Sequence, residues 1–394
     1  MTTNKAPEAG SPRTEVFEFE GDIARASTIP SRCYTDPAFL ALEEERVFGR
    51  TWQLVGRTAQ VASGGEFFTA EIGPESIVVL RDGEQLRGFH NICLHRAGPV
   101  AHGCGKRQTL QCRYHGWTYA LDGQLMRAPE MEDSSGFRAS DFRLMPVQVA
   151  TFGPLVFASL DPDAPPLAHF LGDIPGRAAR FSVEQMRWVM RKSWTIACNW
   201  KVYVDNYLEG YHIPVVHPSL NKEIDYGAYR VEPHRYWSLQ HAPLRAVAAS
   251  GAGDRKYVPA EAGEQAQYYW LFPNVMLNVY QGQMQTNVVL PRGHDRCEVV
   301  FDWYSATPPA DPSADAHWTK LVAFSDEIQD EDIEICVQVQ KNLRSRAYDR
   351  GRYSALREVG VHHFHSLLHE FLRTEDRGPR TKTSSCGLPN TDNR

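Results

Sequence analysis

The chain has 394 residues, of which 42% are hydrophobic and 23% charged, a composition typical of a globular protein long enough for two domains. A formal net charge of −6 and a pI near 6.2 do not favour nucleic acid or an anionic membrane as a partner, because both attract clustered positive charge. No apolar run reaches the length of a membrane span, and the polar first fifteen residues lack the apolar core of a signal peptide, so we expect a cytoplasmic protein.

The first half of the chain predicts a tail, a helix and a small β domain. Residues 1–15 are small and polar and are expected to be disordered. Residues 36–50 predict a helix, because an aspartate N-cap and a proline at the first helical position precede apolar residues at helical spacing. Short β-type runs separated by turns extend over residues 52–160 and predict an antiparallel β domain. The proline-rich segment 162–166 predicts a linker.

The second half mixes helices and strands. Residues 199–212 predict a helix, which Pro214 and Pro218 are expected to end. The polar stretch 245–265, rich in Gly and Ala, predicts a mobile loop near a pocket. Strand-like runs and long helical patterns follow at residues 267–280, 285–290, 297–304, 313–346 and 361–373. Strands flanked by long helices favour an α+β domain.

Two thiolates and two imidazoles lie close together in the pattern Cys93-x-His95, sixteen residues, Cys112-x-x-His115. Such ligands suit tetrahedral zinc, or a two-iron, two-sulfur cluster in which two histidines replace two cysteines on one iron. Each half has cysteine first and histidine second, which favours the cluster, because zinc folds usually group like ligands. Cys104 lies between two glycines and is expected in a turn rather than as a ligand.

A second group of potential ligands comprises Glu209, His212 and His217. Glu209 and His212 are three residues apart and would share one face of a helix, and Pro214 would bend the chain to bring His217 back. Two histidines and one carboxylate hold Fe(II) in non-haem oxygenases and leave positions open for O2. That carboxylate has to come from elsewhere, and the acidic run 326–332 offers candidates.

Three segments resemble one family, the large (α) subunits of the Rieske non-haem iron oxygenases. CLHRAGPVAHGCGKRQTLQCRYHGW, residues 93–117, resembles the family's Rieske domain. NWKVYVDNYLEGYHIPVVHP, residues 199–218, resembles its His-x4-His iron motif, and EDIEICVQVQ, residues 331–340, resembles the segment that donates an aspartate. The resemblance covers roughly residues 45–375.

The resemblance implies a [2Fe-2S] Rieske cluster and a mononuclear Fe(II) site. The residues that match the family's cluster ligands are Cys93, His95, Cys112 and His115. Those that match its iron ligands are His212, His217 and Asp332, with Asp330 as the alternative to Asp332. Glu209 matches a carboxylate that, in the family, joins a cluster histidine of one subunit to an iron histidine of the next, and Asp205 is a weaker candidate for that role.

The resemblance also implies an α+β architecture and partners. Residues 1–50 would form a tail and helices on the catalytic domain, residues 51–162 the antiparallel β Rieske domain, and residues 163–394 a helix-grip (START-like) catalytic domain with an antiparallel sheet and long helices. Family members form homotrimers or stacked trimers with head-to-tail contacts. Electrons derived from NAD(P)H would come from a separate flavin/iron–sulfur reductase, because no nucleotide-binding Gly-rich motif is evident here.

The stretch 268–291 resembles the choline monooxygenase branch, which implies that O2 is used to hydroxylate or oxidatively demethylate a small quaternary or N-methylated amine of the choline, betaine or carnitine type. Aromatic faces can surround a trimethylammonium group, although we expect most of the aromatic residues here to belong to a sheet core. They are Tyr268, Tyr269, Trp270, Phe272 and Tyr280. An aromatic-ring-hydroxylating dioxygenase or aryl demethylase is the alternative, and an electron-transfer Rieske protein or a structural zinc protein represents another class.

Overall fold

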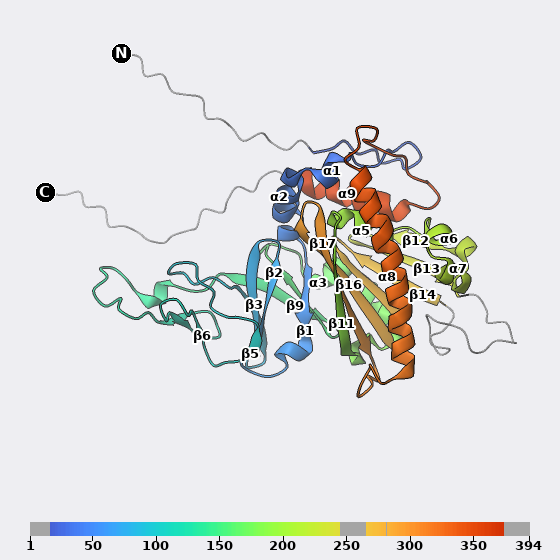
Figure 1. Ribbon diagram of the computed structural model, residues 1–394. Coiled ribbons are helices and arrows are strands. Elements are labelled where there is room, and N and C mark those ends of the chain that lie inside the picture. The colour runs from blue at the N-terminus through green and yellow to red at the C-terminus, as the bar shows by residue number, and fades with distance from the viewer. Residues whose placement is uncertain (1–15, 245–264, 281, 374–394) are drawn as a thin grey trace, which may run out of the picture.

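The computed structural model describes residues 16–244, 265–280 and 282–373, which form two β-rich halves side by side with helices over the second half (Figure 1). The segment 1–15, expected to be disordered, lies outside the described residues. So does the expected mobile loop 245–265, apart from its last residue. Among the described helices, none is long and apolar enough to cross a membrane.

The first half is built on a seven-stranded antiparallel sheet, which confirms the predicted β domain. Its strand order is β1-β10-β9-β4-β3-β2-β5. These strands are β1 (Gln53–Arg57), β2 (Glu66–Ile72), β3 (Glu75–Asp82), β4 (Gln85–His90), β5 (Cys104–Lys106), β9 (Pro146–Phe152) and β10 (Leu155–Ser159). Cys104 was wrongly expected in a turn: it is exposed and begins β5, where it pairs with Phe68 of β2.

A three-stranded sheet extends the first half at the end farther from the long helices (Figure 1). Its strands are β6 (Leu110–Gln111), β7 (Thr118–Tyr119) and β8 (Leu125–Arg127). A small core of its own lies beneath these strands, with Trp117, Tyr119 and Phe89 among its buried residues. The loops before β5 and between β6 and β7 therefore stand on a rigid base.

The second half contains another seven-stranded antiparallel sheet, in the order β11-β17-β16-β15-β14-β13-β12. Its strands are β11 (Arg187–Ile196), β12 (Arg230–Pro233), β13 (Trp237–Pro243), β14 (Gln265–Leu271), β15 (Val275–Tyr280), β16 (Gln283–Gly293) and β17 (Arg296–Ser305). The run predicted as one strand at 267–280 is two strands, because the chain reverses at residues 272–274 and β14 pairs antiparallel with β15.

The helices lie mainly against the second half (Figure 1). They are α1 (Arg32–Thr35), α2 (Pro37–Arg46), α3 (Leu167–Leu171), α4 (Ile174–Ala178), α5 (Trp200–Tyr207), α6 (Ile213–Val216), α7 (Pro218–Glu223), α8 (Ala316–Asn342) and α9 (Val359–Arg373). The long α8 is capped at its N-terminus by Asp315, whose side chain accepts hydrogen bonds from the backbone N–H groups of His317 and Trp318. Short 3-10 turns occur at 48–50, 58–61, 139–141, 179–181, 183–185 and 226–228.

The predicted helix at 199–212 is wrong in its second part. Asn199 caps α5 as expected for a helix start, but the helix ends at Tyr207. Gly210, in the loop that follows, lies so close to the ring of Tyr229 that a Cβ atom would come within 2.9 Å of it, so a larger residue does not fit there without a shift. The two prolines begin α6 and α7 instead of only ending a helix, because proline is favoured in the first helical turn.

The N-terminal helices are joined to the second half by buried polar contacts. The ammonium Nζ of Lys201 on α5 lies 2.6 Å from the carboxylate Oε1 of Glu43 on α2, and both side chains are 1% exposed. The indole of Trp200 donates to the other carboxylate oxygen of Glu43 at 2.7 Å. The guanidinium of Arg46 donates to the backbone carbonyl of Leu372 in α9 at 2.7 Å.

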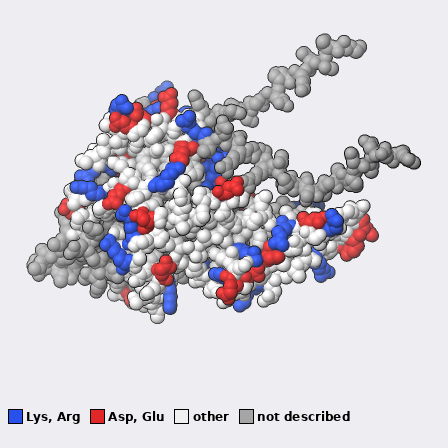
Figure 2. All heavy atoms as spheres, turned by 180° about the vertical axis from the view of Figure 1, so that it is seen from behind, with Lys and Arg blue, Asp and Glu red and all other residues white. Residues whose placement is uncertain are grey.

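Positive and negative side chains are interspersed over the face drawn in Figure 2.

Candidate metal centres and substrate pocket

Two matching loops present the Cys/His tetrad. The backbone N–H of Cys93 donates to the carbonyl of Gly98 at 2.7 Å, and that of Cys112 donates to the carbonyl of Trp117 at 2.9 Å. Four residues after each cysteine, the backbone is left-handed, with φ of 58° at Ala97 and 74° at Gly116. The sequence therefore folds both halves of the motif into the same loop shape, each with one thiol at its base.

The cysteines and the histidines of the tetrad lie in different surroundings. Both cysteines are 2% exposed, whereas His95 and His115 are exposed. The two imidazole rings meet edge to face at 4.5 Å between centroids, and His95 stacks on Trp117. A cluster held here would have its cysteine side in the protein and its histidine side at the surface.

The tetrad offers two cysteines and two histidines, the ligand set of a two-iron, two-sulfur cluster with the cysteines on one iron and the histidines on the other. A second group within the described ranges comprises His212, His217 and Asp332, whose ligand atoms all lie within 4.8 Å of one another.

Tyr119 supports the cysteine side of this site. Its hydroxyl lies 3.3 Å from the Sγ atom of Cys93 and accepts a hydrogen bond from the backbone N–H of Leu94 at 2.9 Å. Burial raises the pKa of the Cys93 thiol, and the hydroxyl of Tyr119 acts in the opposite direction. A hydroxyl that donates to a cluster ligand stabilises the reduced, more negative state.

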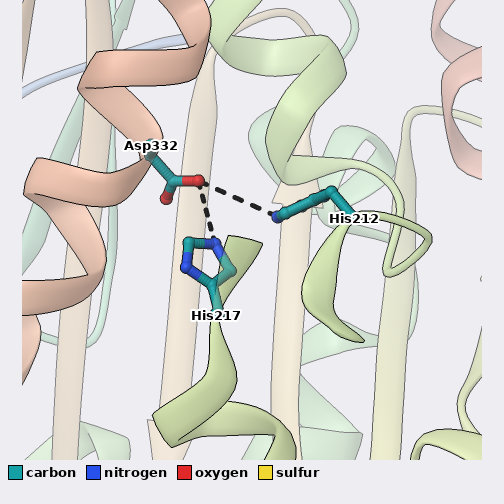
Figure 3. Close-up of side chains that lie close together, drawn as sticks. All are labelled: His212, His217 and Asp332. Atoms are coloured by element: carbon teal, nitrogen blue, oxygen red, sulfur yellow. Dashed lines mark hydrogen bonds and ion pairs between the residues drawn. The ribbon is translucent and has the colours of Figure 1, made fainter. Parts of the chain in front are cut away.

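His212, His217 and Asp332 converge at the second candidate centre, from the loop before α6, the junction of α6 with α7, and the middle of α8 (Figure 3). The Oδ1 atom of Asp332 lies 3.0 Å from Nε2 of His217 and 3.8 Å from Nε2 of His212. Asn206 of α5 donates to the same oxygen at 2.6 Å. Asp330, the alternative to Asp332, is exposed and outside the group.

Each of the two histidines is oriented by a glutamate on its other ring nitrogen. Nδ1 of His212 lies 2.5 Å from Oε1 of Glu209, and Nδ1 of His217 lies 2.6 Å from Oε2 of Glu331. Burial lowers the pKa of His217, but the hydrogen bonds and charges of Asp332 and Glu331 outweigh burial and raise it. With both Nδ1 atoms engaged, both Nε2 atoms face the carboxylate, which is the donor set expected around Fe(II).

The second glutamate was missed in the sequence analysis. Glu331 precedes Asp332 in the acidic run 326–332, and nothing in that run distinguishes it from its neighbours. Glu209 reaches His212 through the turn of a loop, not along a helix face as expected. Asp205 lies away from both histidines: its carboxylate accepts from the hydroxyl of Tyr34 at 2.6 Å and pairs with His365 at 2.9 Å.

A pocket of about 110 Å³ opens beside this group. It lies between the second sheet, α5, α8 and the loops around α6 and α7, and its lining includes five aromatic rings. They are Tyr203, Tyr207, Tyr229, Tyr268 and Phe301. Of the aromatic residues considered in the sequence, Tyr268 lines this pocket, whereas Tyr269, Trp270 and Phe272 are buried in the main core as expected. Tyr280 lines a separate, smaller cavity.

Comparison with known proteins identifies the class. Residues 51–152 match the family described as the Rieske [2Fe-2S] domain, and residues 181–374 match the family described as the ring hydroxylating alpha subunit (catalytic domain). The chain belongs to the Rieske non-haem iron oxygenases, as an α subunit carrying both the cluster domain and the catalytic domain.

The relatives point to one branch of that family. The chain is 38% identical to choline monooxygenase of Arabidopsis thaliana, over 91% of this chain and 86% of the relative. It is 31% identical to the carnitine monooxygenase oxygenase subunit of Escherichia coli strain K12, over 88% and 94% respectively. A solved quaternary ammonium Rieske monooxygenase in complex with γ-butyrobetaine is 25% identical, covers 91% of this chain and 100% of its own, and has a TM-score of 0.76.

Proposed function

We propose that this oxygenase uses O2 and two electrons from a separate reductase to hydroxylate or oxidatively demethylate a small quaternary or N-methylated amine. The observation that carries the proposal is the pocket beside the His212, His217 and Asp332 group, whose lining holds five aromatic rings. Aromatic faces attract quaternary ammonium groups when water is excluded. Relatives that act on choline and carnitine support the same substrate class.

The four residues of the tetrad would hold the Rieske cluster, and His212, His217 and Asp332 would hold the iron. When bound, the cluster supplies electrons singly and the iron activates O2. Glu209 and Glu331 keep the Nε2 atoms of both histidines turned toward Asp332, and Asn206 holds the carboxylate in place. The aromatic and aliphatic part of the lining would keep bulk water away from the substrate.

A homotrimer with head-to-tail contacts is part of the proposal. Within one chain the cluster loops and the α6–α7 region lie at opposite ends of the molecule (Figure 1), so a second subunit is needed to bring a cluster near each iron. Exposed apolar side chains support contacts at both ends: Leu94 and Tyr114 beside the cluster loops, Tyr211 and Val215 beside Glu209. The cytoplasmic location expected from the sequence stays a prediction.

The test is a substrate panel with the reconstituted protein and a surrogate reductase. Choline, glycine betaine, carnitine and γ-butyrobetaine are compared with simple aromatic acids, and O2 consumption is matched to product by mass spectrometry. At least one quaternary ammonium compound is expected to give product in step with O2 consumption. Hydroxylation of aromatic acids with no turnover of any quaternary ammonium compound would contradict the proposal and favour a ring-hydroxylating enzyme.

A further inference from the structure

Amide side chains occupy the pocket face of the second sheet, where apolar residues would be expected. Gln240 on β13, Tyr268 on β14, Asn278 on β15 and Gln285 on β16 are successive partners in the strand register and form one row across four strands. Asn287 lies two residues beyond Gln285 on the same face of β16. Buried polar residues at core positions favour a binding role over a stabilising one.

Most of the row is held in place by its own hydrogen bonds. The hydroxyl of Tyr207 donates to the side-chain oxygen of Asn278 at 2.8 Å, and the amide nitrogen of Asn278 donates to Gln285 at 3.3 Å. The amide nitrogen of Gln285 donates to the hydroxyl of Ser325 on α8 at 3.2 Å. This chain of contacts fixes the pocket wall without using a charged group.

Two amide atoms among the pocket-lining residues have no partner. The side-chain oxygen of Asn287 accepts no hydrogen bond, and the amide nitrogen of Gln329 donates none. The two residues are 4% and 1% exposed, and both line the pocket. Leaving a buried polar atom unpaired costs roughly 1–3 kcal/mol, so Asn287 has an unused acceptor and Gln329 an unused donor at residues that line the pocket.

The chemistry of this wall suits an uncharged hydroxyl group. A hydroxyl can donate to an amide oxygen such as that of Asn287 or accept from an amide nitrogen such as that of Gln329, whereas a carboxylate can only accept. Within the described part of the chain, the pocket lining contains neither lysine nor arginine. Away from the proposed iron, a carboxylate buried at this wall would lose its hydration without gaining a cationic side chain as a partner.

We propose that this pocket selects quaternary ammonium compounds whose other end is an uncharged hydroxyl, with Asn287 and Gln329 as the specificity-determining residues. The inference rests on the proposed function and narrows its substrate class: ammonium alcohols bind, and ammonium carboxylates of the same length are disfavoured. The aromatic rings of the pocket hold the ammonium group in both kinds of compound, so the opposite end of the ligand decides between them.

Isothermal titration of the iron-loaded protein without O2 tests the inference independently of turnover. Three ligands share one trimethylammonium head: choline ends in a hydroxyl, glycine betaine in a carboxylate, and ethyltrimethylammonium in a methyl group. Choline is expected to bind at least about tenfold more tightly than either of the others, as expected for one well-placed hydrogen-bonded group. The Asn287→Leu variant is expected to bind choline and ethyltrimethylammonium within about threefold of each other, because the acceptor is gone.

Thr286→Val is the matched control. Thr286 precedes Asn287 on β16, is fully buried and lies outside the pocket lining, so its replacement is expected to keep the preference of the wild-type protein. Tighter binding of glycine betaine than of choline by the wild-type protein would overturn the inference and leave the proposed function standing. No binding of any quaternary ammonium compound would overturn both. If the Asn287→Leu variant keeps its cluster spectrum and prefers choline as strongly as the wild-type protein does, Asn287 does not contribute to the recognition of the hydroxyl group.

Discussion

At the scale of single residues, the orientation of His212 and His217 in the candidate metal site depends on two carboxylates other than that of Asp332. Glu209 and Glu331 each accept from the Nδ1 side of one histidine, which fixes the tautomer that leaves Nε2 free. The side chain of Glu209 is 12% exposed, and the exposed Tyr211 is two residues further along the chain. In the proposed trimer, Glu209 would contact the neighbouring subunit while it holds His212.

Replacing Glu209 with glutamine is expected to slow electron transfer between the two metal sites while both remain bound. A carboxylate accepts from imidazole N–H groups more strongly than a neutral amide, whose NH2 end cannot accept at all. In single-turnover experiments with substrate, oxidation of the reduced cluster by O2 is expected to be slower by roughly tenfold or more in Glu209→Gln.

Asp205→Asn is the control for that experiment, because Asp205 contacts Tyr34 and His365 rather than a histidine of the metal group. Its cluster is expected to be oxidised at the wild-type rate. A Glu209→Gln protein with full iron content and an unchanged rate would show that electrons do not pass through Glu209, and a slow Asp205→Asn protein would point to Asp205 instead.

At the scale of helices and strands, α5 is held by a buried ion pair. Lys201 follows the N-cap of α5 by two residues, and its contact with Glu43 joins the helix to α2 in the N-terminal segment. Breaking a buried pair leaves one charge without a partner, which costs about 3–5 kcal/mol. Because α5 leads directly into the loop of Glu209 and His212, this pair also supports the position of the metal site.

Lys201→Met is expected to destabilise the protein by about 3–5 kcal/mol at neutral pH. Burial already raises the pKa of Glu43, and Lys201 opposes that effect. Without Lys201 the pKa of Glu43 rises further, so the folded variant favours the neutral carboxyl group. The contribution of this group to the stability of the variant is therefore full below the unfolded-state pKa of Glu43. It is lost as pH rises through the folded-state pKa. The thermal midpoint of the variant is therefore expected to fall, relative to wild type, from acidic to neutral pH.

The double variant Glu43→Gln/Lys201→Met separates this effect from lost packing. Glutamine removes the buried charge and still offers an acceptor to the indole of Trp200. Its thermal midpoint is expected to recover a large part of the loss and to show no comparable dependence on pH. Equal destabilisation of the single and double variants at every pH would show that packing of the lysine stem, not the unpaired charge, is responsible.

At the scale of the whole molecule, the two halves share a core but keep their metal sites apart. One continuous core includes residues of the N-terminal segment, the first sheet and the second sheet, such as Phe39, Phe157 and Trp270. The cluster loops stand on a separate, smaller core. Changes at one metal site are therefore expected to leave the fold around the other intact.

His212→Ala and His217→Ala are each expected to lose the mononuclear iron and all oxygenation while the Rieske absorption and EPR spectra remain. Iron analysis, spectroscopy of the reduced protein and product analysis measure the three properties. The matched variant Cys112→Ser is expected to show the reverse: it loses the Rieske spectrum and keeps the mononuclear iron. Loss of the cluster spectrum in either histidine variant would mean that the two sites are coupled through the fold.

The sequence by itself determined which residues are candidate ligands, because residues a few positions apart are brought together by local geometry. The spacing of Cys93, His95, Cys112 and His115 leads to two matching loops. His212 and His217 are brought together by a single bend of the chain. The resemblance to the family rested on these short segments, and the comparisons bear it out.

Only the tertiary structure decided which distant residues meet these ligands. Asp332, rather than its exposed neighbour Asp330, reaches the histidines because α8 turns that face toward α5. Glu331 became recognisable only through its contact with His217. The row of amides on the pocket wall depends on the register of β13 to β16, and register is a long-range property that one residue of slip would reverse. Short local patterns specify the candidate ligand residues, whereas packing between remote segments decides which side chains surround those residues.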